Sequence, residues 1–450
     1  MQNPAELAPA DPESDELSAE DGAVAPDEGG WNARSIYALA FLTLIYAFNT
    51  ADRNVFGLLM PLLKIDMKVS DTTLGLMSGL AFSLFYATVG VPVAFLSDRW
   101  SRRNIIAIGF TIWSLMTVLT GFVQSVWQLA FARFMLGAGE AGGLAPSNSM
   151  ISDLFDRRRR PVALSIMNSA NSLGIMVAFP IVGWIASHHG WRMAFISAGL
   201  PGLAMAAIFF FTVREPLRGR FDGARPNGAP IVSEGFLQTV VRLFSNRTYL
   251  FGVLSSGLVG VALAGVQTWL PTFLMRVHHL GSQEVGSYIG ALRGPAGIVG
   301  AITGGLLTTW LAKRDERWLV WTPALYMALI AASEFLLLTS DNRLGWQAGI
   351  AFDTFFTSAQ VGPVFGLLLA GADSRSRGVA TAGALLVLNL FGLTCGPLLV
   401  GVLNDLLRPS LGDGAIRYSM MAAASASVLA SVVCLAIGRI APAPIRAGPQ

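Results

Sequence analysis

The segment Ala94–Asn104, AFLSDRWSRRN, places one acidic and three basic residues between two long apolar runs. The runs on either side, at roughly 73–96 and 104–122, are each close to the ~20 residues that a helix needs to cross a bilayer. A short basic turn between two such helices is typical of a loop held on the cytoplasmic side of a membrane. The segment therefore predicts a hairpin of two transmembrane helices.

The same pattern of apolar runs continues through most of the chain. Of its 450 residues, 53% are hydrophobic and 13% are charged, whereas about a quarter of the residues of a soluble chain are charged. We therefore expect an all-α polytopic membrane protein. Its twelve transmembrane helices are predicted at roughly 35–57, 73–96, 104–122, 126–152, 162–187, 193–213, 248–275, 284–311, 318–339, 346–370, 378–406 and 418–438.

The distribution of basic residues predicts the orientation of these helices. With both termini on the cytoplasmic side, 21 of the 31 Lys and Arg residues fall in inner segments, seven in outer segments and three within spans. This bias satisfies the positive-inside rule. We expect a multi-pass protein of the cell's inner (plasma) membrane with both termini cytoplasmic.

The polar segments predict how the chain is divided. Residues 1–30 contain nine acidic residues and no Lys or Arg, which is a composition typical of disorder. We expect an acidic cytoplasmic tail at 1–33, a six-helix bundle at 34–213, a cytoplasmic linker at 214–247, a second bundle at 248–440 and a short tail at 441–450.

The two predicted bundles resemble each other weakly. DRRRRPVA at Asp156–Ala163 matches DSRSRGVA at Asp373–Ala380, and Pro180 matches Pro397 at the same offset of 217 residues. Two similar bundles of the same orientation, related by a pseudo-two-fold axis, are typical of a transporter with its site at their interface. Chance matching of apolar sequence is the alternative.

AFLSDRWSRRN resembles the signature loop of the major facilitator superfamily, Gly-x-x-x-Asp-Arg-x-Gly-Arg-Arg. Ala94 and Ser101 stand where that pattern has glycine, and Thr309 replaces the aspartate in the corresponding loop of the second half. GLTCGPLLVG at Gly392–Gly401 is similar to the family's Gly-x-x-x-Gly-Pro motif. Together with NTADRNVFG and RFMLGAGEAG, these motifs resemble the spinster-like branch, and this implies export of sphingoid phosphates and lysophospholipids, often with proton coupling.

The family resemblance also implies a cytoplasmic gate at the signature loop. Asp98 is expected to face the start of the eleventh span near Gly378, and Arg102 or Arg103 to pair with Asp153. The alternative is a basic loop that only fixes orientation. The predicted gate residues are Asp98, Arg99, Arg102, Arg103 and Asp153.

Charged residues inside two predicted spans form the predicted central site. Asn49, Asp52 and Arg53 share one face of the first span, and Arg133 and Glu140, two turns apart, share a face of the fourth. Ionisable residues at this depth are costly and are expected to face a cavity or another helix. The facilitator resemblance implies that the first and fourth helices line one central cavity.

We interpret Asp52, Arg53, Arg133 and Glu140 as the proton-coupling site. Burial and the distance to an arginine both change the proton affinity of a carboxylate, so a proton taken up in one state is released in another. Either carboxylate is eligible. The alternative is a static charge network that only ties helices together.

Polar residues in the second half supply further candidates for the substrate cavity. With Asn49, these are Gln267, Arg293, Asp353, Gln360 and Asn389, set among apolar and aromatic residues. A cavity that is charged on one side and apolar on the other suits an amphiphile such as a lysolipid or a sphingoid-like molecule. The alternative is that these aromatic residues face lipid.

The sequence favours a secondary transporter over other functions. No HExxH, GxSxG or P-loop motif occurs in the chain, so we predict no enzyme activity, no cofactor, no metal and no ATP-driven step. The expected partners are an amphiphilic substrate, protons and the bilayer, without nucleic acid, for a monomer that works by alternating access. A proton-coupled carrier of small organic anions or drugs is the alternative function.

Overall fold

The computed structural model describes residues 31–219, 221, 236–315, 317–370, 383–384 and 387–440, and every regular element in this part of the chain is helical. In chain order the elements are α1 (Ala33–Met67), α2 (Asp71–Ser78), α3 (Leu80–Arg99), α4 (Arg102–Thr120), α5 (Val126–Glu140), α6 (Leu144–Leu154), α7 (Arg160–Thr212), α8 (Phe236–Ser245), α9 (Arg247–Val277), α10 (Ser282–Ala312), α11 (Trp318–Thr339), α12 (Arg343–Ala370), the π-helix η1 (Leu388–Gly392), α14 (Leu393–Leu411), the 3-10 helix η2 (Gly412–Gly414) and α15 (Ala415–Ile440).

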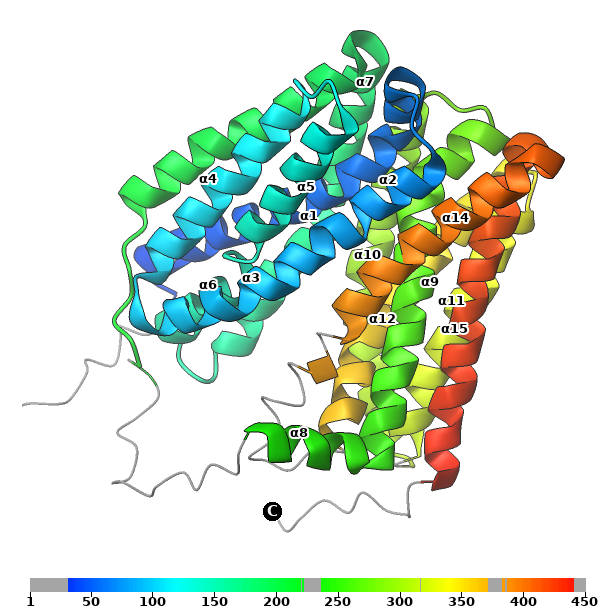
Figure 1. Cartoon of the computed structure of the whole chain (residues 1–450). Coiled ribbons are helices and arrows are strands. Elements are labelled where there is room, and N and C mark those ends of the chain that lie inside the picture. The colour runs from blue at the N-terminus through cyan, green and yellow to red at the C-terminus, as the bar shows by residue number, and fades with distance from the viewer. Residues whose placement is uncertain are drawn as a thin grey trace, which may run out of the picture.

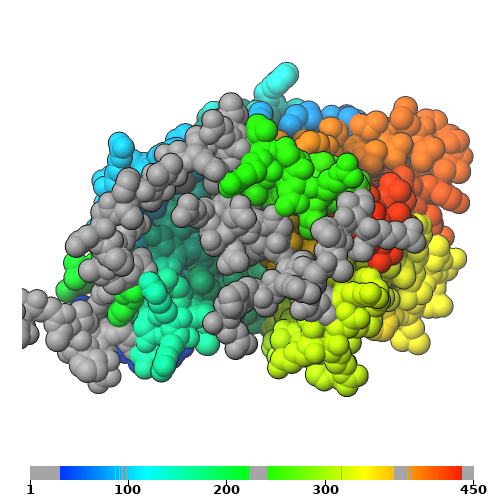
Figure 2. All heavy atoms as spheres, turned by 90° about the horizontal axis from the view of Figure 1, so that it is seen from below, coloured from blue at the N-terminus to red at the C-terminus, as the bar shows by residue number. Residues whose placement is uncertain are grey.

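The helices form two groups (Figure 1). The first half, α1 to α7, and the second half, α9 to α15, touch at one end, where α2 lies beside α14. They diverge toward the end at which the chain passes from α7 to α8. We call these the junction end and the linker end. Figure 2 looks at the linker end from below and shows α8, in green, beside the second half.

Several predicted spans differ in their limits from the helices. The second span is broken at Gly79 into α2 and α3, and the fourth is broken after Glu140 into α5 and α6. The fifth and sixth spans form one helical run, α7, which turns at Gly190, where a φ of 81° favours glycine. Helix α1 continues past residue 57 to Met67 and ends at its C-cap Lys68, whose backbone is left-handed with a φ of 53°.

The apolar surface of the helices is that of a membrane protein. Seven stretches of the described chain are long and apolar enough to cross a bilayer, and the two longest, of 53 and 48 residues, each fold back once. Helices α1, α5 and α12 fall outside this set, and they bury the charged residues Asp52, Glu140 and Asp353. Large side chains such as Phe211 and Leu306 are 82% and 67% exposed, as expected for residues that contact lipid.

The two halves approach each other closely at the junction end. Helix α7 packs against α10, α2 against α14, and α1 against α9. A Cβ on Gly75 would lie 2.5 Å from the carbonyl oxygen of Pro397, so only glycine allows α2 and α14 to approach this closely. The two halves therefore pack directly against each other at this end.

Some predictions fall outside the described residues. These are the tails at 1–30 and 441–450, most of the linker, the Asp373–Ala380 repeat with Gly378, and the side chains of Asp98 and Asn389. Helix α8 occupies part of the segment 214–247 that was predicted to be a linker, and its Leu243 packs with Tyr249 and Val253 of α9.

Candidate functional site

An ion pair links the first and fourth predicted spans. Arg53 of α1 donates from Nη2 to Oε2 of Glu140 at the end of α5, over 2.7 Å. The Glu140 side chain is fully buried, whereas that of Arg53 is 29% exposed. The guanidinium of Arg53 also lies over the rings of Phe82 and Tyr86, at 4.7 and 5.4 Å. The pair therefore has one buried member and one accessible member.

Asp52 is turned away from this pair toward α4. Its Oδ2 accepts a hydrogen bond of 2.5 Å from Thr117 Oγ1, and its Oδ1 is buried without a partner in the described structure. Thr117 was not predicted as a site residue. Threonine is common in apolar helices, where its hydroxyl ordinarily lies near a backbone carbonyl one turn earlier, as Thr117 Oγ1 does at 3.0 Å from the carbonyl oxygen of Trp113, so the sequence contained no signal for this contact.

Arg133 is buried beside the other three charges but makes no ion pair within the described residues. Its guanidinium lies 4.2 Å from the ring centroid of Phe56, and Nε donates to the carbonyl of Met77 at 3.5 Å. Asp52 and Glu140 are near enough to act on it electrostatically. We call Asp52, Arg53, Arg133 and Glu140 the first-half charge cluster.

Glycine allows the helices of this cluster to pack closely. A Cβ on Gly139 would lie 2.8 Å from the backbone nitrogen of Trp113 in α4, so glycine brings the end of α5, and with it Glu140, against α4. Asn49, one turn before Arg53, is buried and lines a small cavity with Tyr46, Trp113 and Ser147. The polar face predicted for the first span is therefore directed into the first half.

The predicted polar residues of the second half are dispersed. Arg293 and Asp353 are buried and interact electrostatically, and Gln267 is half-buried and forms no hydrogen bond within the described residues. Gln360 is 5% exposed and lines an apolar pocket between α9, α12 and η1. That pocket also contains Val259, Leu263, Phe365 and Leu388.

One buried carboxylate of the second half was not predicted. Glu334 of α11 is 0% exposed and accepts a hydrogen bond of 3.2 Å from Ser427 Oγ of α15. Its other oxygen is buried without a partner among the described residues. The sequence signal was a single acid in an apolar run.

A network of ionic and hydrogen bonds joins the halves at the junction end. Asp71, fully buried, accepts two bonds of 2.8 Å from Arg276 of α9 and pairs with Lys64 at 2.7 Å. Asn404 of α14 also donates to Asp71. Asp405 accepts the first backbone N–H groups of α2, those of Asp71 and Thr72, as an acid at a helix N-terminus should. We call Lys64, Asp71, Arg276, Asn404 and Asp405 the junction network.

Of the predicted gate residues, Arg102, Arg103 and Asp153 lie at the linker end and form contacts there with one another or with Glu215. Arg102 donates to Asp153 over 2.5 Å and to Glu215 over 2.8 Å. The sequence predicted that either Arg102 or Arg103 would pair with Asp153, and the structure shows that it is Arg102. The backbone of Arg103 donates to Glu215, and Arg99 is exposed. Burial would raise the pKa of Glu215, but bonds from Arg103 and Arg102 outweigh it and hold the pKa below its usual range.

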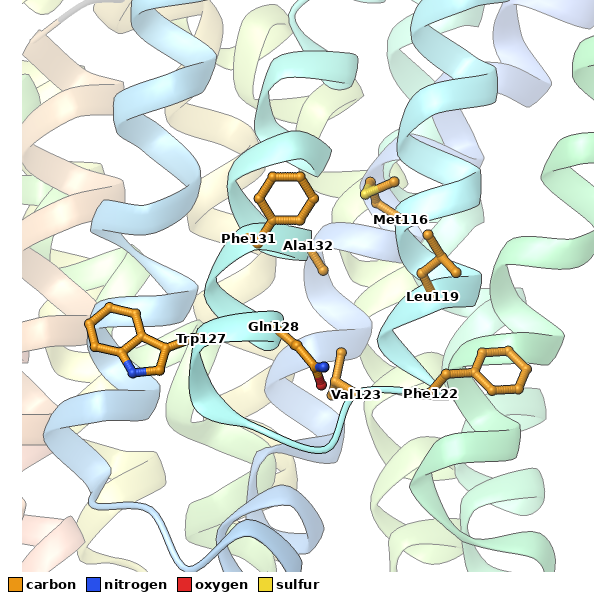
Figure 3. Close-up of a pocket in the computed structure, with 8 residues that line it drawn as sticks. All are labelled: Met116, Leu119, Phe122, Val123, Trp127, Gln128, Phe131 and Ala132. Carbon is orange, nitrogen blue, oxygen red and sulfur yellow. The ribbon is translucent and has the colours of Figure 1, made fainter.

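The groove on the outside of the first half is not part of the candidate site. The groove in Figure 3, between α4 and α5, is lined by apolar side chains such as Phe122 and Trp127, which are 63% and 84% exposed on the outside of the first half. This is a surface for lipid. Within the described residues, no cluster of His, Cys, Asp and Glu is suited to a metal ion.

Comparison with known proteins defines the class. The family model of the Major Facilitator Superfamily matches residues 42–393, most of the chain, and the protein belongs to this superfamily. It is therefore a multi-pass membrane transporter of the facilitator fold, carrying a small molecule across the membrane. The fold class predicted from the sequence is confirmed.

Within the superfamily, the chain resembles the spinster proteins. An MFS-type efflux pump of Mycolicibacterium smegmatis is 29% identical over 407 residues, covering 89% of this chain and 92% of the pump. The sphingosine-1-phosphate transporter SPNS2 of Danio rerio is 26% identical over 400 residues, covering 85% of this chain and 78% of its own. A bacterial homologue of the human lysosomal transporter spinster, crystallised in an inward-facing and unoccupied conformation, gives a TM-score of 0.80 at 26% identity, covering 91% and 98%. The predicted resemblance to the spinster-like branch is confirmed.

Proposed function

We propose that the protein is a secondary active transporter that moves an amphiphilic substrate, such as a lysolipid or a sphingoid-like molecule, by alternating access with proton coupling. The observation that carries this proposal is the ion pair between the accessible Arg53 and the buried Glu140. A proton bound by Glu140 removes the charge that holds Arg53, and the guanidinium becomes available to an anionic head group. Binding of the substrate and binding of the proton would then both act on the ion pair between Arg53 and Glu140.

The apolar pocket of the second half supports an amphiphilic substrate. Its lining is hydrocarbon except for Ser256, Thr357 and Gln360, whereas the first half presents the Arg53 guanidinium. We propose that the head group binds near Arg53 and the tail lies against α9 and α12. The Danio rerio relative is named as a transporter of sphingosine-1-phosphate, an amphiphile with an anionic head.

The junction network supports an assignment of the conformational state. If the linker end is cytoplasmic, as the positive-inside rule implies, the halves are closed toward the outside and the state is inward-facing. The outward-facing state then requires release of Asp71 from Arg276 and Asn404. We propose this orientation, in the inner membrane and as a monomer, with the residues around Arg102 and Asp153 as the cytoplasmic gate.

The second candidate is a proton-coupled carrier of small organic anions or drugs. Exposure of Arg53 suits a small anion equally well, and one relative is an MFS-type efflux pump. Competition between a lysolipid and a small carboxylate for the purified carrier separates the two. Displacement of the lysolipid only by other long-chain amphiphiles supports the first candidate.

The test of proton coupling uses Asp52→Asn and Glu140→Gln in reconstituted vesicles. Both variants keep the shape of the side chain and remove its titration. We expect at least one of them to abolish substrate accumulation driven by a pH gradient and to leave substrate exchange without a gradient largely intact. If both variants still accumulate substrate as the parent does, the first-half charge cluster is structural and the coupling assignment is wrong.

A further inference from the structure

Glu334 lies in a part of the second half that the proposed mechanism does not use. It is buried where α11 packs against α10, α12 and α15. Ser427 of α15 donates a hydrogen bond from its hydroxyl to Glu334. Asp353 of α12 lies near enough for the two carboxylates to repel each other. Arg293 of α10 is the base that acts on Asp353. Among the described residues, no lysine or arginine pairs with Glu334.

The charge of this group does not balance unless a proton is bound. Glu334 and Asp353 are two acids, and Arg293 is one base, and all three are at most 5% exposed. With both acids ionised, one negative charge would remain uncompensated in apolar surroundings, which is strongly unfavourable. One oxygen of each acid, and also Nε of Arg293, has no hydrogen-bond partner among the described residues, so no fixed hydrogen bond there supplies the missing compensation.

We propose that Glu334 and Asp353 together bind one proton, and that they are a second proton-binding site of this carrier, separate from the first-half charge cluster. The bound proton neutralises one acid while the other remains opposite Arg293. Because the two carboxylates interact, the proton belongs to the pair and not to one residue. We call Glu334 and Asp353 the second-half carboxylate pair.

The role of this proton in transport rests on the proposed function. In the inward-facing state the pair holds its proton away from the space between the halves. A displacement of α10 relative to α12 would change the distance between Arg293 and the pair. A shorter distance would release the proton, and a longer distance would retain it. The pair would then add a second proton to the transport cycle.

The direct test is infrared spectroscopy of the purified carrier in H2O and D2O at neutral pH. A protonated carboxyl group has a carbonyl stretch that shifts on deuteration. Glu334→Gln keeps the shape of the side chain, and it should remove one such band, because Asp353 and Arg293 then balance. Arg293→Gln should add a band, because the base that keeps one acid ionised is gone. Asp413→Asn, which removes an acid whose side chain is 58% exposed, should leave the spectrum unchanged.

These outcomes separate this proposal from the coupling proposal. An unchanged spectrum in Glu334→Gln overturns the second proton site even if Asp52→Asn abolishes uptake. Unchanged uptake in Asp52→Asn and Glu140→Gln overturns the coupling assignment even if the Glu334 band is lost. If Glu334→Gln does not fold, Arg293→Gln still decides, and the absence of an added band overturns the proposal.

Discussion

The first half places two acids and two arginines between α1 and α5, and all but Arg53 are buried, whereas the second half buries two acids and one arginine among α10, α11 and α12. The first cluster is neutral without a bound proton, and its Arg53 is 29% exposed. The second is neutral only with a proton, and its Glu334 is 0% exposed. Under the two proposals, similar residue types therefore serve different tasks: Arg53 and Glu140 exchange partners in the first half, and the carboxylate pair stores a proton in the second.

Substitution of Arg53 should have the largest effect, because it breaks the charge balance of the first half. Arg53→Ala leaves the buried Glu140 without its partner, and we expect a loss of stability of about 3 kcal/mol, near the lower end for a broken buried pair because Arg53 is partly exposed. Transport should fall below detection both with and without a pH gradient. Thermal unfolding in detergent and vesicle uptake measure the two effects.

A double variant isolates the cause of this loss. Arg53→Ala with Glu140→Gln removes both charges, so most of the stability should return while transport does not. Recovery of transport in the double variant would show that Arg53 has no role beyond neutralising Glu140. It would then contradict its assignment as the residue that binds the substrate head group.

Substitution in the junction network should have an intermediate effect on the equilibrium between the two conformational states, because the network contains residues of both halves. The first half supplies Lys64 and Asp71, and the second supplies Arg276. Arg276→Ala removes two bonds but leaves Lys64 on Asp71, so a cost of about 1–2 kcal/mol is expected for the closed junction. This corresponds to roughly a tenfold shift toward the alternate state.

Distances between spin labels measure that shift. Lys68 and Ser410 are exposed residues of the two halves near the junction network, and labels can be placed there after Cys395, which is exposed, is replaced by serine. Arg408→Ala is the matched control, since Arg408 pairs with Asp413 of its own half at 3.4 Å. A label distance that changes no more in Arg276→Ala than in Arg408→Ala would show that the network does not hold the junction.

The sequence predicted the charges that follow a helical repeat. Arg53 and Glu140 stood out because each shares a helix face with a second polar residue in an otherwise apolar run, and the structure brings the two together at 2.7 Å. Glu334 was equally visible as an acid in an apolar run, but it has no base at helical spacing. No charge pair within one helix therefore pointed to it.

The junction network could not be predicted from the sequence, for a different reason. Asp71 begins a short helix, where an acid is ordinary. Its partners Arg276 and Asn404 lie 205 and 333 residues away, so no local pattern connects them. The glycines that bring α2 against α14 act through the same distant contacts. Packing between the two halves decides both features, and a hydropathy pattern describes only one helix at a time.

The smallest effect is expected from Gln360, and it tests whether the apolar pocket of the second half receives the substrate tail. Gln360 is 5% exposed and its Oε1 is buried without a partner in the described structure. Gln360→Leu removes this unsatisfied polar group and changes the side-chain volume little. We expect it to strengthen binding of a hydrocarbon tail in the pocket by about 1 kcal/mol, which is roughly fivefold in affinity. The apparent KM for a long-chain lysolipid should fall by that factor while that for a small organic anion stays the same. Gln347, half-buried in the same helix but not among the residues that line the pocket, provides the control variant Gln347→Leu, which should change neither value. If Gln360→Leu transports normally with the KM of the parent for the lysolipid, the tail lies elsewhere. The apolar pocket would then no longer distinguish the two halves as tail and head sites.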